Sequence, residues 1–221
     1  MIENLLHPRL VESNDWATIV FVLAFSLIAL TKSLFENRFS EFAKLIFSNK
    51  YLKVYKDSGH SLSWFNVILF FVQLISFSFL IQIVAADKGI FHKNDGITYI
   101  RIFTFLGVFI LSKYIIDKII ATVFKIEDFS EQFNMQKLSY RTYISVMSLP
   151  IIVFLYYNDV ISSELISLFL LVILLINSLT YLKSLKNYQN LLLSKMFYFI
   201  LYLCALEIAP IYFLYYWFTK S

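Results

Sequence analysis

Three charged residues in otherwise apolar stretches are the side chains of this sequence best suited to chemistry. Glu207 lies inside the phrase LYLCALEIAP, while Lys113 and Asp117 both lie in the phrase KYIIDK. A charged group at membrane depth costs several kcal/mol unless it is paired, protonated or facing a polar cavity. A carboxylate and an amine at that depth could relay protons, hold a substrate headgroup or form an internal ion pair. Their role depends on the helices that position them.

Counting residues along the expected helices brings these three side chains to similar depth. Lys113 and Asp117 are four residues apart and share one helical face. The helices carrying Lys113 and Glu207 are expected to run in opposite directions, which places the two within about 7 Å along the membrane normal at 1.5 Å per residue. We therefore predict an intramembrane polar cluster of Lys113, Asp117 and Glu207. Two interpretations stay open: a charge-balanced network that fixes helix register, or a proton, substrate or catalytic site.

Other polar residues in apolar stretches admit two interpretations as well. Asn66 and Gln73 are seven residues apart and share one face of a single expected helix, and Asn177 lies in a later one. Each either hydrogen-bonds a neighbouring helix or lines a polar path. Arg101 opens an expected span and either contacts a lipid phosphate or extends to the interface as an anchor.

The composition indicates what kind of element holds these residues. Of 221 residues, 59% are hydrophobic and 15% are charged, with four glycines and three prolines, and the mean hydropathy is +0.71. These values are typical of a membrane protein built from long regular helices. We predict an all-α, polytopic transmembrane helical bundle that forms one integral membrane domain over residues 1–221.

Six apolar stretches are long enough to serve as spans, at roughly 20 residues each. The fourth is short and contains Pro150, so the fourth and fifth could instead form a tight hairpin or a re-entrant pair. The expected spans are 16–35, 62–85, 99–124, 142–157, 161–182 and 192–218.

The positive charges predict how these spans are oriented. Fourteen lysines and arginines fall on the side of the first, third and fifth loops, against five on the other side. Because positive residues are retained in the cytoplasm, both termini are expected on the opposite, periplasmic side. The N-terminus lacks the basic start and the cleavage site of a signal peptide, so the first span should persist. Membrane lipids are the expected partners and nucleic acid is not, because the basic residues do not form a patch on a soluble face.

Two loops on the cytoplasmic side carry amphipathic patterns. In the first, aromatic and aliphatic residues recur at helical spacing and predict a helix that lies in the membrane interface or packs beneath the bundle. In the second, acidic neighbours favour packing on protein over contact with anionic lipid. The apolar residues are Phe35, Phe39, Phe42 and Ile46 in the first loop, and Ile126, Phe129 and Phe133 in the second.

Motifs for soluble chemistry are missing from the sequence. His7, His60 and His92 are far apart and do not have metal-ligand spacing, and Cys204 is the only cysteine. The four glycines do not form a phosphate-binding loop. We therefore expect no metal, no cofactor and no catalytic residues.

The closing segment resembles the C-terminal signature of a family of multipass inner-membrane proteins of unknown function found in Bacteroidota. The resemblance rests on about twenty residues, and implies a bacterial source and a cytoplasmic-membrane location without assigning an activity. The matching positions are Leu201, Tyr202, Cys204, Leu206, Glu207, Ile208 and Pro210.

The sequence favours a non-catalytic inner-membrane subunit or accessory factor of a bacterial envelope assembly, with other inner-membrane or envelope proteins as partners. Small loops leave little room for soluble chemistry, and the amphipathic segments could dock on a partner. The main alternative is a transporter or lipid-handling protein that uses the Lys113, Asp117 and Glu207 cluster. A third possibility is an enzyme acting on a lipid, which would need an acid and base pair reachable from one leaflet.

Overall fold

The structure is a computed structural model that describes residues 15–45, 51, 63–123, 127–158 and 162–187. Within these ranges the regular elements are all helices, which confirms the all-α class. Five of them are long and apolar enough to cross a membrane: all except α2. The helices are α1 (Asp15–Leu34), α2 (Glu36–Ala43), α4 (Trp64–Asp87), α5 (Gly96–Val123), α6 (Glu127–Tyr157) and α7 (Ser163–Asn187).

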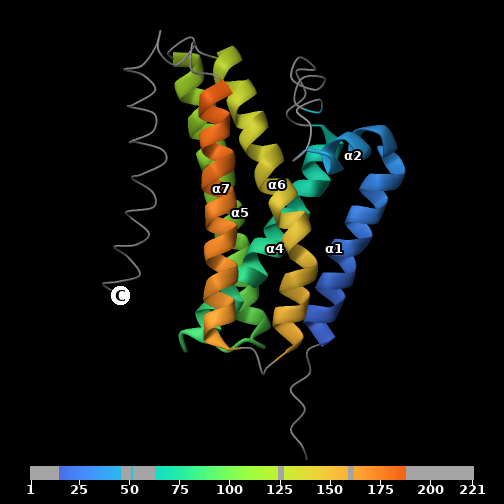
Figure 1. Cartoon of the computed structure of the whole chain (residues 1–221), viewed down its shortest axis with the longest axis vertical. Coiled ribbons are helices and arrows are strands. Elements are labelled where there is room, and N and C mark those ends of the chain that lie inside the picture. The colour runs from blue at the N-terminus through green and yellow to red at the C-terminus, as the bar shows by residue number, and fades with distance from the viewer. Residues whose placement is uncertain (1–14, 46–50, 52–62, 124–126, 159–161, 188–221) are drawn as a thin grey trace, which may run out of the picture.

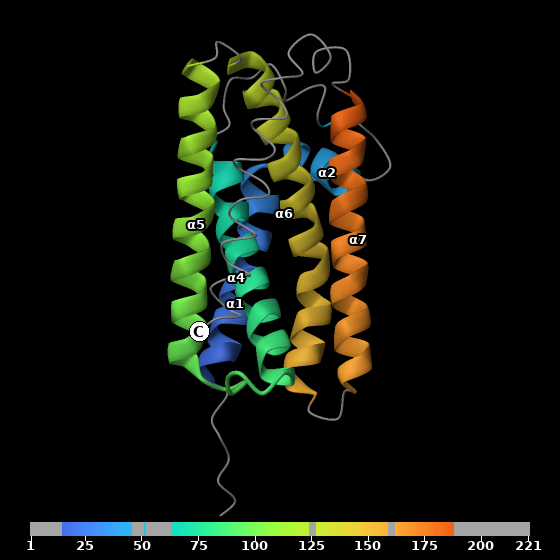
Figure 2. The same cartoon turned by 90° about the vertical axis from the view of Figure 1, so that its left-hand side faces the viewer.

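The five long helices run side by side along the long axis of the molecule (Figures 1 and 2). α4 lies in the middle and contacts α1, α5, α6 and α7. In the most apolar 18-residue window of each helix, 61% of α4 and 56% of α6 are buried, against 6% of α5 and 11% of α7. We call the end that carries α2 the α2 end, and the end that carries the α4 to α5 connection the loop end (Figure 1).

The main core is aromatic toward the loop end. Phe21 of α1 stacks on Phe79 of α4 with ring centroids 4.1 Å apart, and Phe79 lies 4.4 Å from Tyr99 of α5. Trp16 and Tyr156 complete the group, with Trp16 contacting Phe79, Tyr99 and Tyr156. Aromatic pairs of this kind contribute about 0.5 to 1.5 kcal/mol beyond their buried area. They fix α1, α5 and α6 around α4.

α6 is much longer than the sequence suggested. The expected start of the fourth span at residue 142 falls in the middle of a 31-residue helix that begins at Glu127, with a candidate span over Ser130–Tyr157. The polar residues Gln136 and Ser139 are buried inside the bundle and do not form a solvated loop. Because both residues are polar, a prediction from hydropathy alone leaves them outside the fourth span. α6 and the 25-residue α7 are each long and apolar enough to cross a membrane.

A second, smaller core joins α2 to the bundle. Phe42 of α2 is buried with Tyr51, Phe65 of α4 and Tyr143 of α6. Packing beneath the bundle is therefore the interpretation that fits α2, although Ile46 lies outside the described residues. In the second amphipathic loop, Phe133 is buried within α6 itself. The predicted segment there is the start of a long helix; the side chains of residues 126 and 129 are not described.

Candidate functional site

Two of the three residues of the predicted charged cluster lie on α5. Asp117 is only 4% exposed, although its neighbours Ile115 and Ile116 are exposed. Lys113 is half-buried one turn away, and both side chains have interaction partners within the protein. Burial of a carboxylate on an otherwise open helix requires a polar contact that offsets the loss of hydration. Glu207 lies outside the described residues, so its contact with Lys113 stays a prediction.

Asn66 and Gln73 lie where α4 packs on α6. The Thr142 hydroxyl on α6 donates a 2.9 Å hydrogen bond to the Gln73 side-chain oxygen. The amide nitrogen of Asn66 lies 3.6 Å from the sulfur of Met135, also on α6. In an apolar surrounding, bonds between helices hold two elements in one register. Asn66 and Gln73 therefore contribute to helix packing.

Small hydroxyl residues continue this contact along α6. Ser76 of α4 donates a 3.0 Å hydrogen bond to the backbone carbonyl of Ser145. Ser145 and Ser148 donate back to the carbonyls of Thr142 and Ser145, at 2.7 and 3.0 Å. Spacing by three keeps these side chains on one face, and their small size lets the helix backbones approach closely. We call Gln73, Ser76, Thr142, Ser145 and Ser148 the hydroxyl seam.

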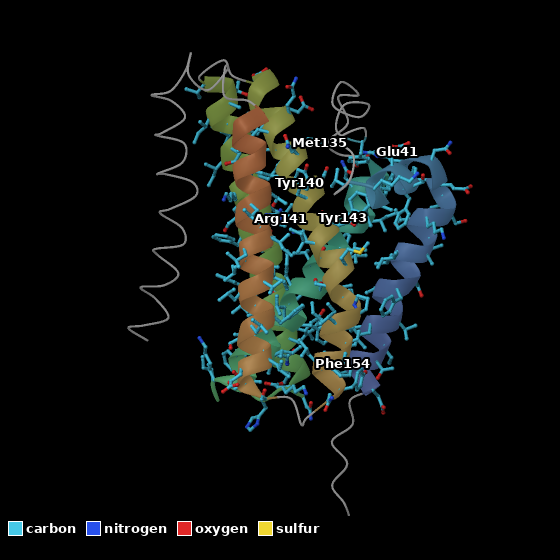
Figure 3. All side chains as sticks on the ribbon, in the orientation of Figure 1. Glu41, Met135, Tyr140, Arg141, Tyr143 and Phe154 are labelled. Carbon is cyan, nitrogen blue, oxygen red and sulfur yellow. The ribbon has the colours of Figure 1, made fainter. Side chains whose placement is uncertain are left out.

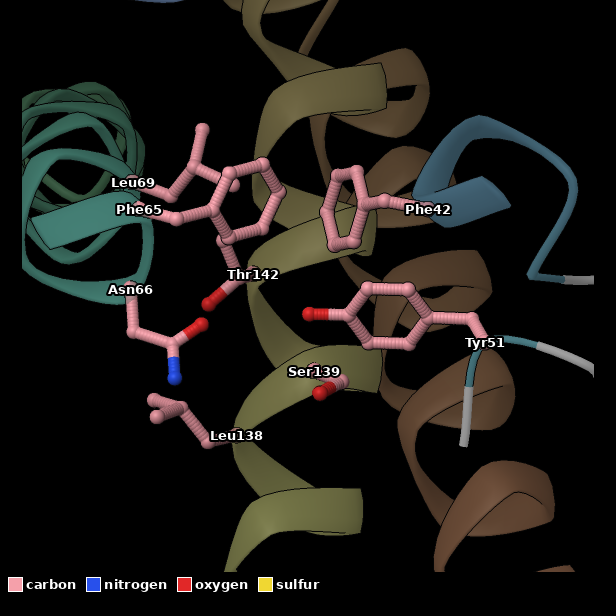
Figure 4. A pocket seen from close by; sticks show the side chains of 8 residues that line it. All are labelled: Phe42, Tyr51, Phe65, Asn66, Leu69, Leu138, Ser139 and Thr142. Carbon is pink, nitrogen blue, oxygen red and sulfur yellow. The ribbon is translucent and has the colours of Figure 1, made fainter. Parts of the chain in front are cut away.

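A small pocket opens beside the seam at the α2 end (Figure 4). Polar groups of Tyr51, Asn66, Ser139 and Thr142 lie around it, between apolar walls. Phe65 and Leu69 come from α4, Leu138 from α6 and Phe42 from α2. The open space is small, which suits a water molecule better than a substrate. The amide nitrogen of Gln73, whose side-chain oxygen bonds Thr142, is buried and has no hydrogen-bond acceptor among the described residues.

Arg38 ties α2 to the start of α4 beside this pocket. Its guanidinium donates to the Ser63 hydroxyl at 2.8 Å and to the Asn66 side-chain oxygen at 3.3 Å. It also lies over the Phe65 ring, 4.6 Å from the centroid. The planar guanidinium suits several directed bonds and ring stacking at once, which an ammonium group does not. Arg38 was not singled out from the sequence, where it resembles any loop cation.

Aromatic and charged residues of α6 extend this region along the helix. In Figure 3, Tyr140, Arg141 and Tyr143 follow one another on the half of α6 nearer the α2 end, and Phe154 lies near the loop end. The Tyr143 hydroxyl donates to the Ala43 backbone carbonyl of α2 at 3.3 Å. This contact with α6, in addition to the bonds of Arg38 to Ser63 and Asn66, helps to hold α2 on the bundle.

Asn177 lies apart from the seam. Its amide donates to the Ile173 carbonyl of its own helix at 2.9 Å, and its role in lining a polar path stays a prediction.

Arg101 lies on an exposed turn of α5 near the loop end. The hydrogen bond from the Thr98 hydroxyl lowers the pKa of the Asp95 carboxyl, against a partial rise from burial, and backbone donors and the Arg101 charge lower it further. Arg101 therefore has a charged neighbour in the protein, which leaves its predicted headgroup contact untested.

Comparison with known families identifies the group to which these helices belong. A domain described as a domain of unknown function (DUF4271) matches residues 17–218. The chain belongs to the DUF4271 family. The match includes every described helix of the bundle and the predicted sixth span. No curated protein and no solved structure gave a significant match. The resemblance to an uncharacterised family is confirmed at this level, while its bacterial group and C-terminal signature stay predictions.

The DUF4271 family carries no assigned chemistry, so the site must be judged on its own residues. Among the described residues, groups of three or more histidine, cysteine, aspartate or glutamate side chains that could hold a metal ion were not found. What the described part of this DUF4271 protein does show is a polar seam joining buried helices, and one buried carboxylate on an open helix.

Proposed function

We propose that this DUF4271 protein is a non-catalytic integral inner-membrane subunit or accessory factor of a bacterial cell-envelope assembly. The observation that carries the proposal is the unequal burial of its helices. α4 and α6 form a packed centre, whereas α5 and α7 leave most of their apolar windows open. Apolar helix surfaces of this length mate with lipid or with other transmembrane helices. Two such surfaces on one small bundle are suited to holding neighbours together.

The packed centre supports the same proposal. Some of its polar side chains form bonds between helices, as Thr142 does with Gln73 and Ser76 with the Ser145 carbonyl. Arg38 and Tyr143 fasten α2 to the bundle. Such bonds favour a rigid unit that presents constant surfaces, because each buried polar group loses its partner if the helices separate. A scaffold subunit requires this rigidity.

Purification from native membranes tests the proposal. The tagged protein would be extracted in a mild detergent, and copurifying proteins and lipids identified by mass spectrometry. We expect other membrane proteins in a fixed ratio that survives further chromatography. Recovery of a lone monomer with one stoichiometric lipid would contradict the subunit role. A tagged, unrelated inner-membrane protein expressed at the same level is the control.

A second candidate function is transport or lipid handling at Lys113, Asp117 and Glu207. The observation that favours it is the burial of Asp117 within a candidate span, because intramembrane carboxylates commonly mark ion or proton paths.

Charge-neutral variants separate the two functions. Asp117→Asn and Glu207→Gln keep the side-chain shape but remove the charge. A subunit whose charges fix packing should lose thermal stability and partner association together. A proton or substrate site should instead give a stable, associated protein that has lost its cellular phenotype, which would overturn the subunit proposal.

A further inference from the structure

The connection between α4 and α5 displays two apolar side chains at its tip. Ile90 is 57% exposed and Phe91 is 42% exposed. Two exposed polar residues flank them: Lys88 precedes the pair and His92 follows it. Side chains of this size are costly to hold in water, at about 25 cal/mol per Å² of apolar surface. Covering Ile90 and Phe91 with an apolar surface would therefore be favourable.

The backbone on the α4 side holds the tip in one conformation. Gly89 has a φ of +71°, the left-handed conformation that glycine adopts without strain. Its amide donates to the Ala86 carbonyl at 2.9 Å, and the Ile90 amide donates to the Ala85 carbonyl at 3.0 Å. This pairing is a common helix ending that directs the next residue away from the helix. The hydrogen-bonded turn at the end of α4 therefore holds Ile90 in an exposed position.

The α5 side of the connection is held just as firmly. Asp95 caps α5 by accepting bonds from the Ile97 amide at 2.9 Å and the Thr98 hydroxyl at 2.5 Å. Its backbone carbonyl accepts a 2.9 Å bond from Gln82 of α4. The Trp16 indole donates to the Asn94 carbonyl at 3.2 Å. These bonds fix the start of α5, so the tip is confined to the short stretch between Gly89 and Asn94.

The short connection limits where the tip can lie. Ile90 is three residues beyond the end of α4, and an extended chain covers at most about 3.6 Å per residue. The tip thus stays within about 11 Å of the helix end, next to the headgroup layer on that side of the bilayer.

Charge identifies the surface that the tip fits. The nearby carboxylates accept bonds from hydroxyl groups of the protein itself: Asp87 from Ser163 at 2.7 Å and Asp95 from Thr98. Lys93 lies over the Tyr156 ring, 5.5 Å from its centroid. Lys88 is left at the exposed rim beside the apolar pair. Apolar side chains edged by cations match the boundary between acyl chains and anionic phosphates.

We propose that residues 88–93 form a membrane-interface anchor in which Ile90 and Phe91 insert among phospholipid headgroups and Lys88 contacts anionic lipid. The anchor fixes the height of α4 and α5 in the bilayer at the loop end. It is independent of the subunit function proposed above.

Depth-dependent fluorescence quenching tests this anchor. A Phe91→Cys variant in a Cys204→Ser background would carry an environment-sensitive dye, and the protein would be placed in nanodiscs containing nitroxide-labelled lipid. The matched control is Ser162→Cys, an exposed position in the other connection at the same end. We expect several-fold stronger quenching by the lipid nitroxide at position 91 than at 162, and the reverse order with a water-soluble quencher. Equal exposure to the aqueous quencher at both positions would overturn the proposal, leaving solvent or a protein as the neighbour.

A charge variant tests the preference for anionic lipid. With the dye at position 91, quenching by nitroxide phosphatidylglycerol is compared with quenching by nitroxide phosphatidylcholine. Lys88→Gln should reduce the extra quenching by nitroxide phosphatidylglycerol over nitroxide phosphatidylcholine. If that extra quenching is unchanged, Lys88 does not contact anionic lipid. Thermal unfolding verifies that each variant is folded. Ile90→Cys replaces Phe91→Cys if the latter is unstable, and must give the same order of quenching.

Discussion

Thr142 of α6 donates a 2.9 Å hydrogen bond to the side-chain oxygen of Gln73 of α4, with both residues buried. The bond joins the two most buried helices of the bundle near the middle of each. A buried amide that loses its partner retains the full cost of lost hydration. This hydrogen bond therefore helps to set the alignment of α4 and α6, and so the position of the hydroxyl seam between them.

Thr142→Val should destabilise the protein by about 0.6 kcal/mol and at most roughly 1.7 kcal/mol, the range of hydrogen bonds between membrane helices. Valine keeps the shape and removes the donor, so Gln73 is left without this bond. Thr104→Val is the matched control, because Thr104 is exposed on α5 and bonds only its own helix. Thermal unfolding in detergent measures both. Equal effects of the two substitutions would argue against a role for the seam in alignment.

Arg38→Lys should loosen α2 although the charge is kept. Lysine cannot bond Ser63 and Asn66 together while lying over Phe65, so the contact should weaken by on the order of 1 kcal/mol. Hydrogen–deuterium exchange of the α2 amides should become faster, with no change in α7. Lys32→Arg, at the exposed last turn of α1, serves as the control. Unchanged exchange in α2 would show that Phe42 and Tyr143 hold α2 without Arg38.

Trp16→Ala should cost about 3 kcal/mol, the lower end of values for removing a packed aromatic side chain. Trp16 lies against Phe79, Tyr99 and Tyr156 and donates to the Asn94 carbonyl. Trp64→Ala is the comparison, because Trp64 is 76% exposed at the first turn of α4. Denaturation midpoints measured under one set of conditions should fall far more for the first substitution. A similar fall for both would mean that the aromatic core contributes little.

Acid should weaken the cap of α5. The pKa of Asp95 is lowered in the folded protein, chiefly by the Thr98 hydroxyl, so its stabilising effect is present above the unfolded value of 3.8. That effect is lost as the pH falls through the folded pKa. Asp95→Asn should therefore lower the melting temperature at about pH 7, and the difference from the unchanged protein should shrink as the pH falls below 3.8. A difference that persists in acid would exclude the charged cap as its cause.

The order of the five long described helices could be predicted from the sequence, because apolar runs of membrane length allow few other structures. The start of α6 could not. Gln136 and Ser139 are polar, and only their contacts inside the bundle show that they belong to a span. The spacing of Thr142, Ser145 and Ser148 by three was visible in the sequence, but nothing in it showed that Ser76 lay opposite.

The candidate site was less predictable than the fold. Asn66 and Gln73 were singled out because polar residues are rare in spans, and they do lie between helices. Arg38 and Tyr51 come from loop sequences whose residue types give no sign of a pocket, since it forms only when α2 packs on α4 and α6. Glu207 lies beyond the described residues, so its pairing with Lys113 still rests on depth counting.

Photo-crosslinking in living cells tests most directly whether the open helices α5 and α7 bind other membrane proteins. A photoreactive amino acid would replace Val108 of α5 or Leu171 of α7, which are exposed, and Ile75 of α4, which is buried. We expect protein adducts of defined mass from positions 108 and 171, and none from position 75. Adducts with lipid alone at both exposed positions would contradict it.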